Sequence, residues 1–144
     1  MPISTGKESA TAGPGTGLGA LRSREAAATI AVDDLKRARE FYEGVLGLTL
    51  VDTEGDQVAI YQTGKSQIMV YVSQFAGTNK ATTITWGVGD ELEGLVQALK
   101  DRGVTFEHYD MPETSRQGEI HAAGNTRVAW FKDPDGNIIS LVNS

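Results

Sequence analysis

The chain of 144 residues carries 13 Lys and Arg against 19 Asp and Glu, with two histidines and no cysteine. This length fits one domain, and an apolar content of 40% is enough for a packed core. The lack of cysteine excludes a disulfide framework, a thiolate metal site and a cysteine nucleophile. The formal charge of −6 argues against generic binding of nucleic acid, because an acidic surface repels the phosphate backbone.

Residues 1–26 differ in composition from the rest of the chain. They hold five of the 17 glycines among Ser, Thr, Ala and Pro, with no periodic apolar pattern. Such a segment buries too little surface to offset its ordering entropy, so we expect a flexible leader, a wrongly assigned start or an added segment. It lacks the apolar core of a signal peptide, and no stretch of the chain approaches 18 apolar residues. We therefore expect no membrane partner and a cytoplasmic protein. Residues 27–144 carry 10 basic and 17 acidic side chains, so the charge of this part of the chain is −7.

The first half of the remaining chain predicts a strand, a helix and three strands. Ala28–Val32 is a short apolar strand, and Asp33-Asp34 provides a helix cap. Apolar residues then recur on one helical face as far as Leu46, and Gly47 ends the helix. Turn residues separate the three strands that follow, which we place at about Leu48–Thr53, Gln57–Gln62 and Gln67–Ser73.

The second half repeats this order. A strand at Thr82–Val88 precedes a helix that we expect Asp90 to cap, with Glu93 in the capping-box position and Gly103 at its end. The remaining predicted segments are a strand at Val104–Tyr109, a polar loop at Asp110–Asn125, and strands at Thr126–Lys132 and Asn137–Val142. Val32 precedes Gly47 by 15 residues and Val88 precedes Gly103 by 15, which indicates a duplicated βαβββ unit.

Two motifs resemble those of a known superfamily. They are V-D-D-L-x-R-A-x-x-F-Y-x-x-V-L-G-L at Val32–Leu48 and F-K-D-P-D-G-N at Phe131–Asn137. Over residues 27–144 the chain resembles the vicinal oxygen chelate superfamily, which includes glyoxalase I, extradiol dioxygenases, and fosfomycin- and bleomycin-resistance proteins. The segment Ser73–Thr82 resembles a bacterial branch of it. The resemblance implies an α+β fold of two tandem βαβββ modules, at about 27–74 and 81–144. Their strands would curl as a mixed sheet around a cleft, with the helices outside, and a homodimer would be usual.

Metal-dependent members of that superfamily place one His, Gln or Glu ligand on each of four strands. The resemblance assigns these four ligand positions to Ala27, Thr83, Ser140 and Val70 of this chain. If the register of the strand shifts by one residue, Met69 or Tyr71 takes the place of Val70. None of these is a strong metal ligand, and Gln67 is the one conventional ligand type near its strand position. We therefore expect no metal and no other cofactor, with a divalent metal as the alternative.

The same resemblance predicts which side chains line the cleft. Small residues at Ala27, Thr29, Ala31, Thr83 and Thr85 would leave volume for a ligand, beside Val70 and Ser140. Trp130 would either stack on that ligand or pack in the core. Trp86 falls on the opposite face of its strand from Thr83 and Thr85, so it should pack under a helix. Phe75 and Tyr109 would form the rim. The negative charge favours a neutral or cationic aromatic ligand.

The two histidines lie off the carried ligand positions. His108 falls at a strand end and His121 in the long loop, where solvated or hydrogen-bonded roles are common. Alternatively, the loop folds over the cleft and brings His121 to the ligand as an acid or base. The catalytic candidates would then be His121, His108 and Asp110, with Glu107 and Tyr109 beside them.

Together these observations predict non-catalytic, or at least metal-independent, binding of a small organic molecule, which resembles the function of bleomycin-resistance-type sequestration proteins. The alternative is a metal-dependent lyase, isomerase or dioxygenase of the superfamily with an atypical site. A third possibility is a regulatory or scaffold dimer whose cleft is vestigial.

Overall fold

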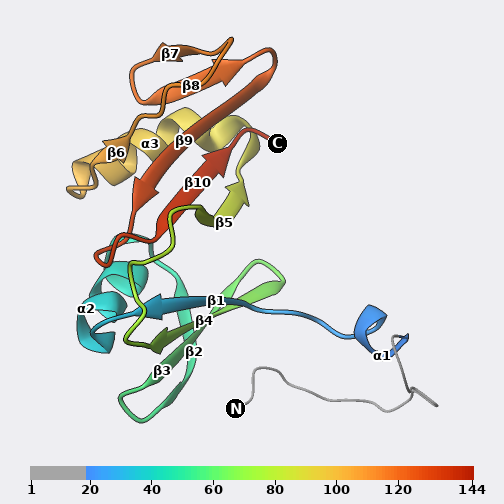
Figure 1. The fold of residues 1–144 in the computed structure, drawn as a ribbon, viewed down its shortest axis with the longest axis vertical. Helices are drawn as coiled ribbons and strands as arrows, with labels where there is room; N and C mark the ends of the chain where they lie inside the picture. Colours follow the sequence, from blue (N-terminus) through green and yellow to red (C-terminus); the bar gives the residue numbers. More distant parts are fainter. Residues whose placement is uncertain (1–18) are drawn as a thin grey trace.

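The computed structural model describes residues 19–144, in two modules joined by an extended segment (Figure 1). Most of the predicted leader, residues 1–18, therefore lies outside the described residues. One helical turn, α1 (Gly19–Arg22), falls within that predicted leader. Among the described residues, no helix is long and apolar enough to span a membrane.

The first module has the predicted βαβββ order. Strand β1 pairs in parallel with β4, and the sheet order is β1-β4-β3-β2. The elements are β1 (Ala28–Val32), helix α2 (Leu35–Arg39), the π-helix η2 (Glu40–Val45), β2 (Thr49–Glu54), β3 (Val58–Thr63) and β4 (Ser66–Val72).

The first helix begins as predicted but changes geometry midway. The Asp34 carboxylate accepts hydrogen bonds from the backbone N–H groups of Lys36 and Arg37, so it is the N-cap. From Glu40 onward the turns widen to π geometry, and Gly47, with φ of 75°, ends the segment. The widened turns leave both Phe41 and Tyr42 buried.

The second module forms a sheet of order β5-β10-β9-β8-β7, with β6 also paired to β9. Its elements are β5 (Thr82–Gly87), the 3₁₀ turn η3 (Gly89–Glu91), helix α3 (Leu92–Asp101), β6 (Phe106–Glu107), β7 (Ser115–Gln117), β8 (Ile120–Ala123), β9 (Thr126–Lys132) and β10 (Ile138–Val142).

Three local predictions for this module are wrong. The strand predicted at Val104–Tyr109 is confined to the two residues of β6. The segment 110–125 is not a plain loop, because β7 and β8 pair within it as a hairpin. Asp90 is not the N-cap of α3, because it lies within the 3₁₀ turn that precedes the helix; the N-cap is Glu91, whose side chain makes no capping hydrogen bond. The carboxylate of Glu93 instead accepts a hydrogen bond of 2.6 Å from Arg127 on β9.

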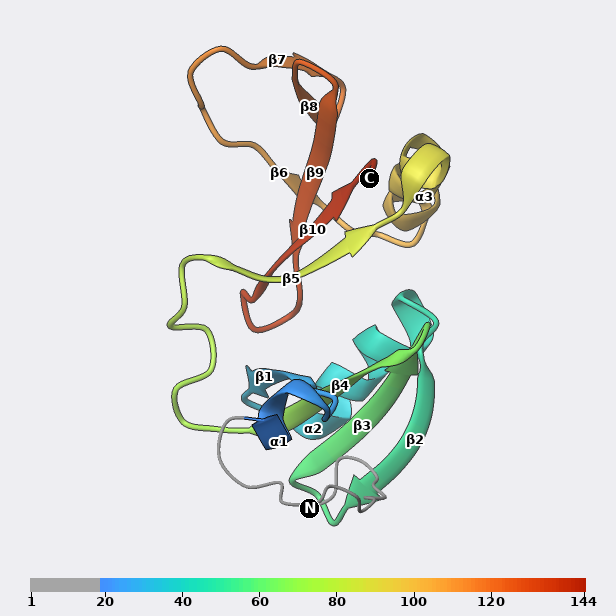
Figure 2. The ribbon, with the colours of Figure 1, turned by 90° about the vertical axis from the view of Figure 1, so that its right-hand side faces the viewer.

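One hydrophobic core joins the modules. Ile30 and Val70 of the first sheet belong to the same buried cluster as Phe131 and Ile139 of the second. Across the boundary the rings of Phe41 and Phe131 lie 6.4 Å apart, and the Trp86 indole N–H donates to Thr63 at 3.0 Å. Figure 2 shows α2 on the side of the first sheet that is turned toward the second module. Trp86 therefore packs against this core, as its parity predicted.

The turn between β9 and β10 fastens the modules together. Asp133, which is 4% exposed, accepts hydrogen bonds from the Tyr42 hydroxyl, from the backbone N–H groups of Asp135 and Asn137, and from the Asn137 side chain. The Asn137 side chain also donates to the Ala31 carbonyl at 2.9 Å. The D-P-D-G-N segment is therefore a turn whose polar side chains bind the first module.

Candidate functional site

The outer face of each sheet is the face turned away from the shared core. On the first sheet, Thr29 is in register with Met69 and Ala31 with Tyr71, so these four residues share the outer face. Val70 is in register with Ile30, is fully buried and belongs to the core cluster. The expectation that Val70 lines the cleft is therefore wrong, because side chains alternate across a strand and its parity is that of the core.

The outer face of the second sheet gathers several of the predicted site residues. Ser140 on β10 lies in register between Thr85 on β5 and Trp130 on β9. The Thr85 and Ser140 hydroxyls are hydrogen-bonded at 2.7 Å. Thr83 sits where the β5–β10 register shifts, and its hydroxyl is buried without a hydrogen-bond partner among residues 19–144.

The predicted cleft residues thus fall on two separate surfaces. Thr29 and Ala31 belong to the four-stranded sheet, whereas Thr85 and Ser140 belong to the six-stranded sheet. Both surfaces are turned away from the core that the sheets share, so they do not face each other across one cleft within a chain. Ala27 is half-buried immediately before β1, and Phe75 is 66% exposed on the segment between the modules.

An aromatic cluster surrounds Trp130. The ring of Tyr109 lies 5.1 Å from the Trp130 ring at 82°, and the ring of His121 lies 5.0 Å away at 71°. Both arrangements are edge-to-face, a favourable geometry for aromatic rings. Burial, followed by the charge of Glu107, raises the pKa of Tyr109, so the phenol stays neutral.

His121 lies on β8, not in a loop, and only 4% of it is exposed. It pairs with Val128, two residues from Trp130 along β9, and so shares the outer face with Trp130. Its Nε2 accepts a hydrogen bond of 3.4 Å from the backbone N–H of Tyr109, while Nδ1 has no partner within the described chain. Burial and then the nearby charges of His108 and Arg116 lower the pKa of His121, although the carbonyls of Glu119 and Val128 oppose this shift.

The other histidine contacts a carboxylate. His108 Nε2 lies 2.9 Å from one carboxylate oxygen of Glu119, and the other oxygen accepts Lys100 Nζ at 2.9 Å. The contact with Lys100, more than His108, holds the pKa of Glu119 below its usual value. The His108 ring still lies 5.3 Å from the His121 ring.

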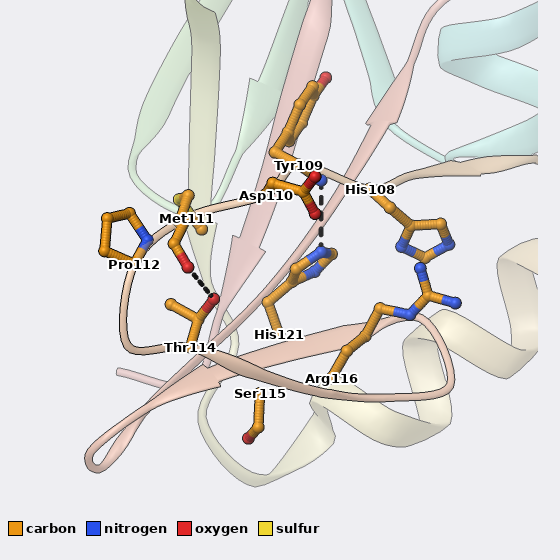
Figure 3. A pocket seen from close by; sticks show the side chains of 9 residues that line it. All are labelled: His108, Tyr109, Asp110, Met111, Pro112, Thr114, Ser115, Arg116 and His121. Carbon is orange, nitrogen blue, oxygen red and sulfur yellow. Dashed lines mark hydrogen bonds between the residues drawn. The ribbon is translucent and has the colours of Figure 1, made fainter.

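A cavity of about 290 Å³ lies beneath the segment that leads from β6 into β7 (Figure 3). We call it the 109–116 cavity. It brings together the three catalytic candidates of the sequence, although they come from the end of β6, the following segment and β8. The lining residues are His108, Tyr109, Asp110, Met111, Pro112, Thr114, Ser115, Arg116 and His121. No pattern in the sequence indicated Arg116, because no local pattern predicted that the β7–β8 hairpin lies beside His108.

The residues at the carried metal positions do not fit a divalent ion. Ala27 and Val70 have no donor atom, and the Ser140 hydroxyl already bonds Thr85. No group of three or more His, Asp or Glu side chains within residues 19–144 is arranged to hold a metal ion. Only the hydroxyls of Thr83 and Ser140 remain as donors, and neutral hydroxyls are weak ligands compared with imidazole or carboxylate.

The class of fold is defined by two modules that share a core, each with a strand and a helix followed by antiparallel strands of one sheet. Residues 25–141 match the family model described as Glyoxalase/Bleomycin resistance protein/Dioxygenase superfamily, and the chain belongs to this superfamily. A probable lactoylglutathione lyase from Vibrio cholerae is 27% identical over 120 residues, which are 78% of this chain and 85% of that protein.

Solved structures share the fold at low sequence identity. A lactoylglutathione lyase from Agrobacterium tumefaciens aligns with a TM-score of 0.62 at 17% identity, over 83% of this chain and 92% of that chain. The fosfomycin resistance protein FosX from Mesorhizobium loti aligns with a TM-score of 0.62 at 14% identity, over 85% and 92%. These matches confirm the α+β fold class that the two halves of the sequence predicted.

Proposed function

We propose that this chain binds a small organic molecule, without a metal ion, on the outer face of the second sheet around Trp130. The observation that carries the proposal is the character of that face. It combines an indole with the Thr85–Ser140 hydroxyl pair. Ser140 occupies one of the positions that the resemblance assigns to metal ligands. Such a surface supplies stacking area and neutral hydrogen-bonding groups, which suit a planar guest.

The charge of the domain supports a particular class of guest. Residues 27–144 carry a charge of −7, which favours the approach of cations over anions within the reach of about 10 Å that 0.1 M salt leaves. An indole face also binds cations through its ring electrons. The ligand that fits this face best is therefore a neutral or cationic aromatic compound.

The complete site would need a second copy of the chain. The outer face of each sheet lacks an opposite wall within one chain, and ligand sites bury most of their guest. In a homodimer, the Thr29 and Ala31 face of one copy could close over the Trp130 face of the other. Sedimentation of the purified protein would show a dimer if this arrangement holds and a monomer if it does not.

The test is a fluorescence titration combined with metal analysis. Planar aromatic compounds, neutral and cationic, are titrated against the protein with and without a chelator. Saturable quenching that persists with the chelator and is lost in Trp130→Phe supports the proposal. Trp86→Phe is the matched control, because Trp86 packs against the core.

The opposite result would favour the metal-dependent alternative. A stoichiometric divalent ion in the purified protein, lost in Ser140→Ala together with binding, would overturn metal-independent binding. The lyase reaction that the Vibrio cholerae relative's name suggests would then be the first activity to assay.

A further inference from the structure

The 109–116 cavity adjoins the proposed aromatic site, since Tyr109 and His121 belong to both, and its walls also carry polar groups that the proposed function does not use. His121 forms part of its wall, and its ring also lies 5.0 Å from the Trp130 ring. A volume of about 290 Å³ corresponds to roughly ten water molecules at about 30 Å³ each. The cavity is therefore large enough for a small organic acid.

The hydrogen bond from Tyr109 fixes the form of the His121 ring. Because Nε2 accepts that N–H, it carries no proton, and the proton of the neutral ring resides on Nδ1. This Nδ1–H group belongs to a side chain that is 4% exposed. The carbonyls of Glu119 and Val128 lie near enough to raise the pKa of the ring, but neither accepts a hydrogen bond of good geometry from Nδ1. A buried donor without an acceptor is unfavourable, so an acceptor on a bound molecule would stabilise it.

Arg116 supplies a positive charge to the same wall. Within the described chain its guanidinium forms no ion pair with a carboxylate, and its charge reaches His121 strongly enough to lower the pKa of that ring. Figure 3 shows the side chains of Arg116 and His108 toward the same side of the cavity. His108 is occupied by Glu119, so Arg116 is the cation left to meet a ligand.

The remaining polar groups of the wall limit the negative charge that a bound ligand can carry. Asp110 is the one carboxylate in the wall, and the Thr114 hydroxyl already donates to the Met111 carbonyl at 2.8 Å. One guanidinium opposed by one carboxylate suits a group with a single delocalised negative charge better than a dianion. Charge-assisted bonds from a guanidinium to a carboxylate are among the strongest in proteins.

We propose that the 109–116 cavity binds a small monocarboxylate, with Arg116 pairing with the carboxylate and His121 Nδ1–H donating to it. The overall negative charge does not forbid this ligand, because screening limits the reach of distant charges to about 10 Å at 0.1 M salt. The site does not depend on the aromatic site being correct.

The experiment uses the full chain and three probes: butyrate, its neutral analogue butyramide, and inorganic phosphate. The ring signals of His121 and His108 are followed by NMR, which is simple because the chain has two histidines. We expect butyrate to bind saturably, to shift the His121 signals and to raise the pKa of His121, because a nearby anion favours the protonated ring. Butyramide and phosphate should bind more weakly.

Two variants locate the interaction. Arg116→Gln should weaken butyrate binding by about tenfold or more, and Lys36→Gln, which removes the same charge from an exposed position on α2, should not. Equal binding of butyrate and butyramide would overturn the proposal, as would tighter binding of phosphate. Equal affinities of the two variants would also overturn it.

Discussion

Replacing Asp133 with alanine tests whether the D-P-D-G-N turn holds the two modules together. Asp133 is 4% exposed and accepts four hydrogen bonds, one of them from the fully buried Tyr42 in the other module. The substitution leaves these donors without their acceptor in a buried region. Each such loss costs about 1–3 kcal/mol, and since the losses are not additive we expect about 3–5 kcal/mol in total. This is a large part of a typical stability of about 5–15 kcal/mol.

The free energy of unfolding is measured by urea titration, followed by circular dichroism. Tyr42→Phe removes one of the four bonds and should cost about 1.5–3 kcal/mol, because the acceptor is a carboxylate. Asp56→Ala, at an exposed aspartate in the β2–β3 turn, is the control and should change stability by less than about 0.5 kcal/mol. If Asp133→Ala behaves like this control, the turn does not fasten the modules and the reasoning is wrong.

Two further predictions concern the backbone and pH. Gly77→Ala should destabilise the fold by about 2 kcal/mol or more, because Gly77 has φ of 77° and an added Cβ would lie 2.5 Å from the Asp135 carbonyl oxygen. Gly94→Ala on α3 meets nothing within 4 Å and should stabilise by up to about 1 kcal/mol; equal effects in thermal melts would refute the steric argument. Stability should also fall as the pH drops from about 6.5, the usual histidine value, through the lower folded pKa of His121, because the unfolded chain then binds more protons. Urea midpoints measured across this pH range should decrease less in His121→Gln than in the original protein. If the midpoints of the two proteins fall equally with pH, His121 is not the cause of the pH dependence.

The sequence predicted the parts of the fold that depend on local patterns. Periodic apolar residues placed both helices, and β1 and β9 have the predicted bounds. The π-helical turns after Arg39 were not predicted, since the apolar spacing of Phe41 and Tyr42 also suits an ordinary α-helix. The β7–β8 hairpin was missed because its strands are short and mostly polar, so pairing across the hairpin decides their conformation.

The candidate site could be predicted only in part. The alternation of side chains along each strand correctly placed Trp130 and Ser140 on the face opposite to that of Trp86. It failed for Val70, because the register of β4 against β1 is a tertiary property and a shift of one residue exchanges the faces. The meeting of His108, Arg116 and His121 depends on how the β6–β7 segment folds back, which no local pattern specifies.

The most direct test of the proposed function is the fluorescence titration of the metal-free protein with a neutral or cationic planar aromatic compound. The proposal predicts saturable quenching that a chelator does not change, that Trp130→Phe abolishes and that Trp86→Phe retains. Binding that requires an added divalent ion, or quenching that survives in Trp130→Phe, would contradict it.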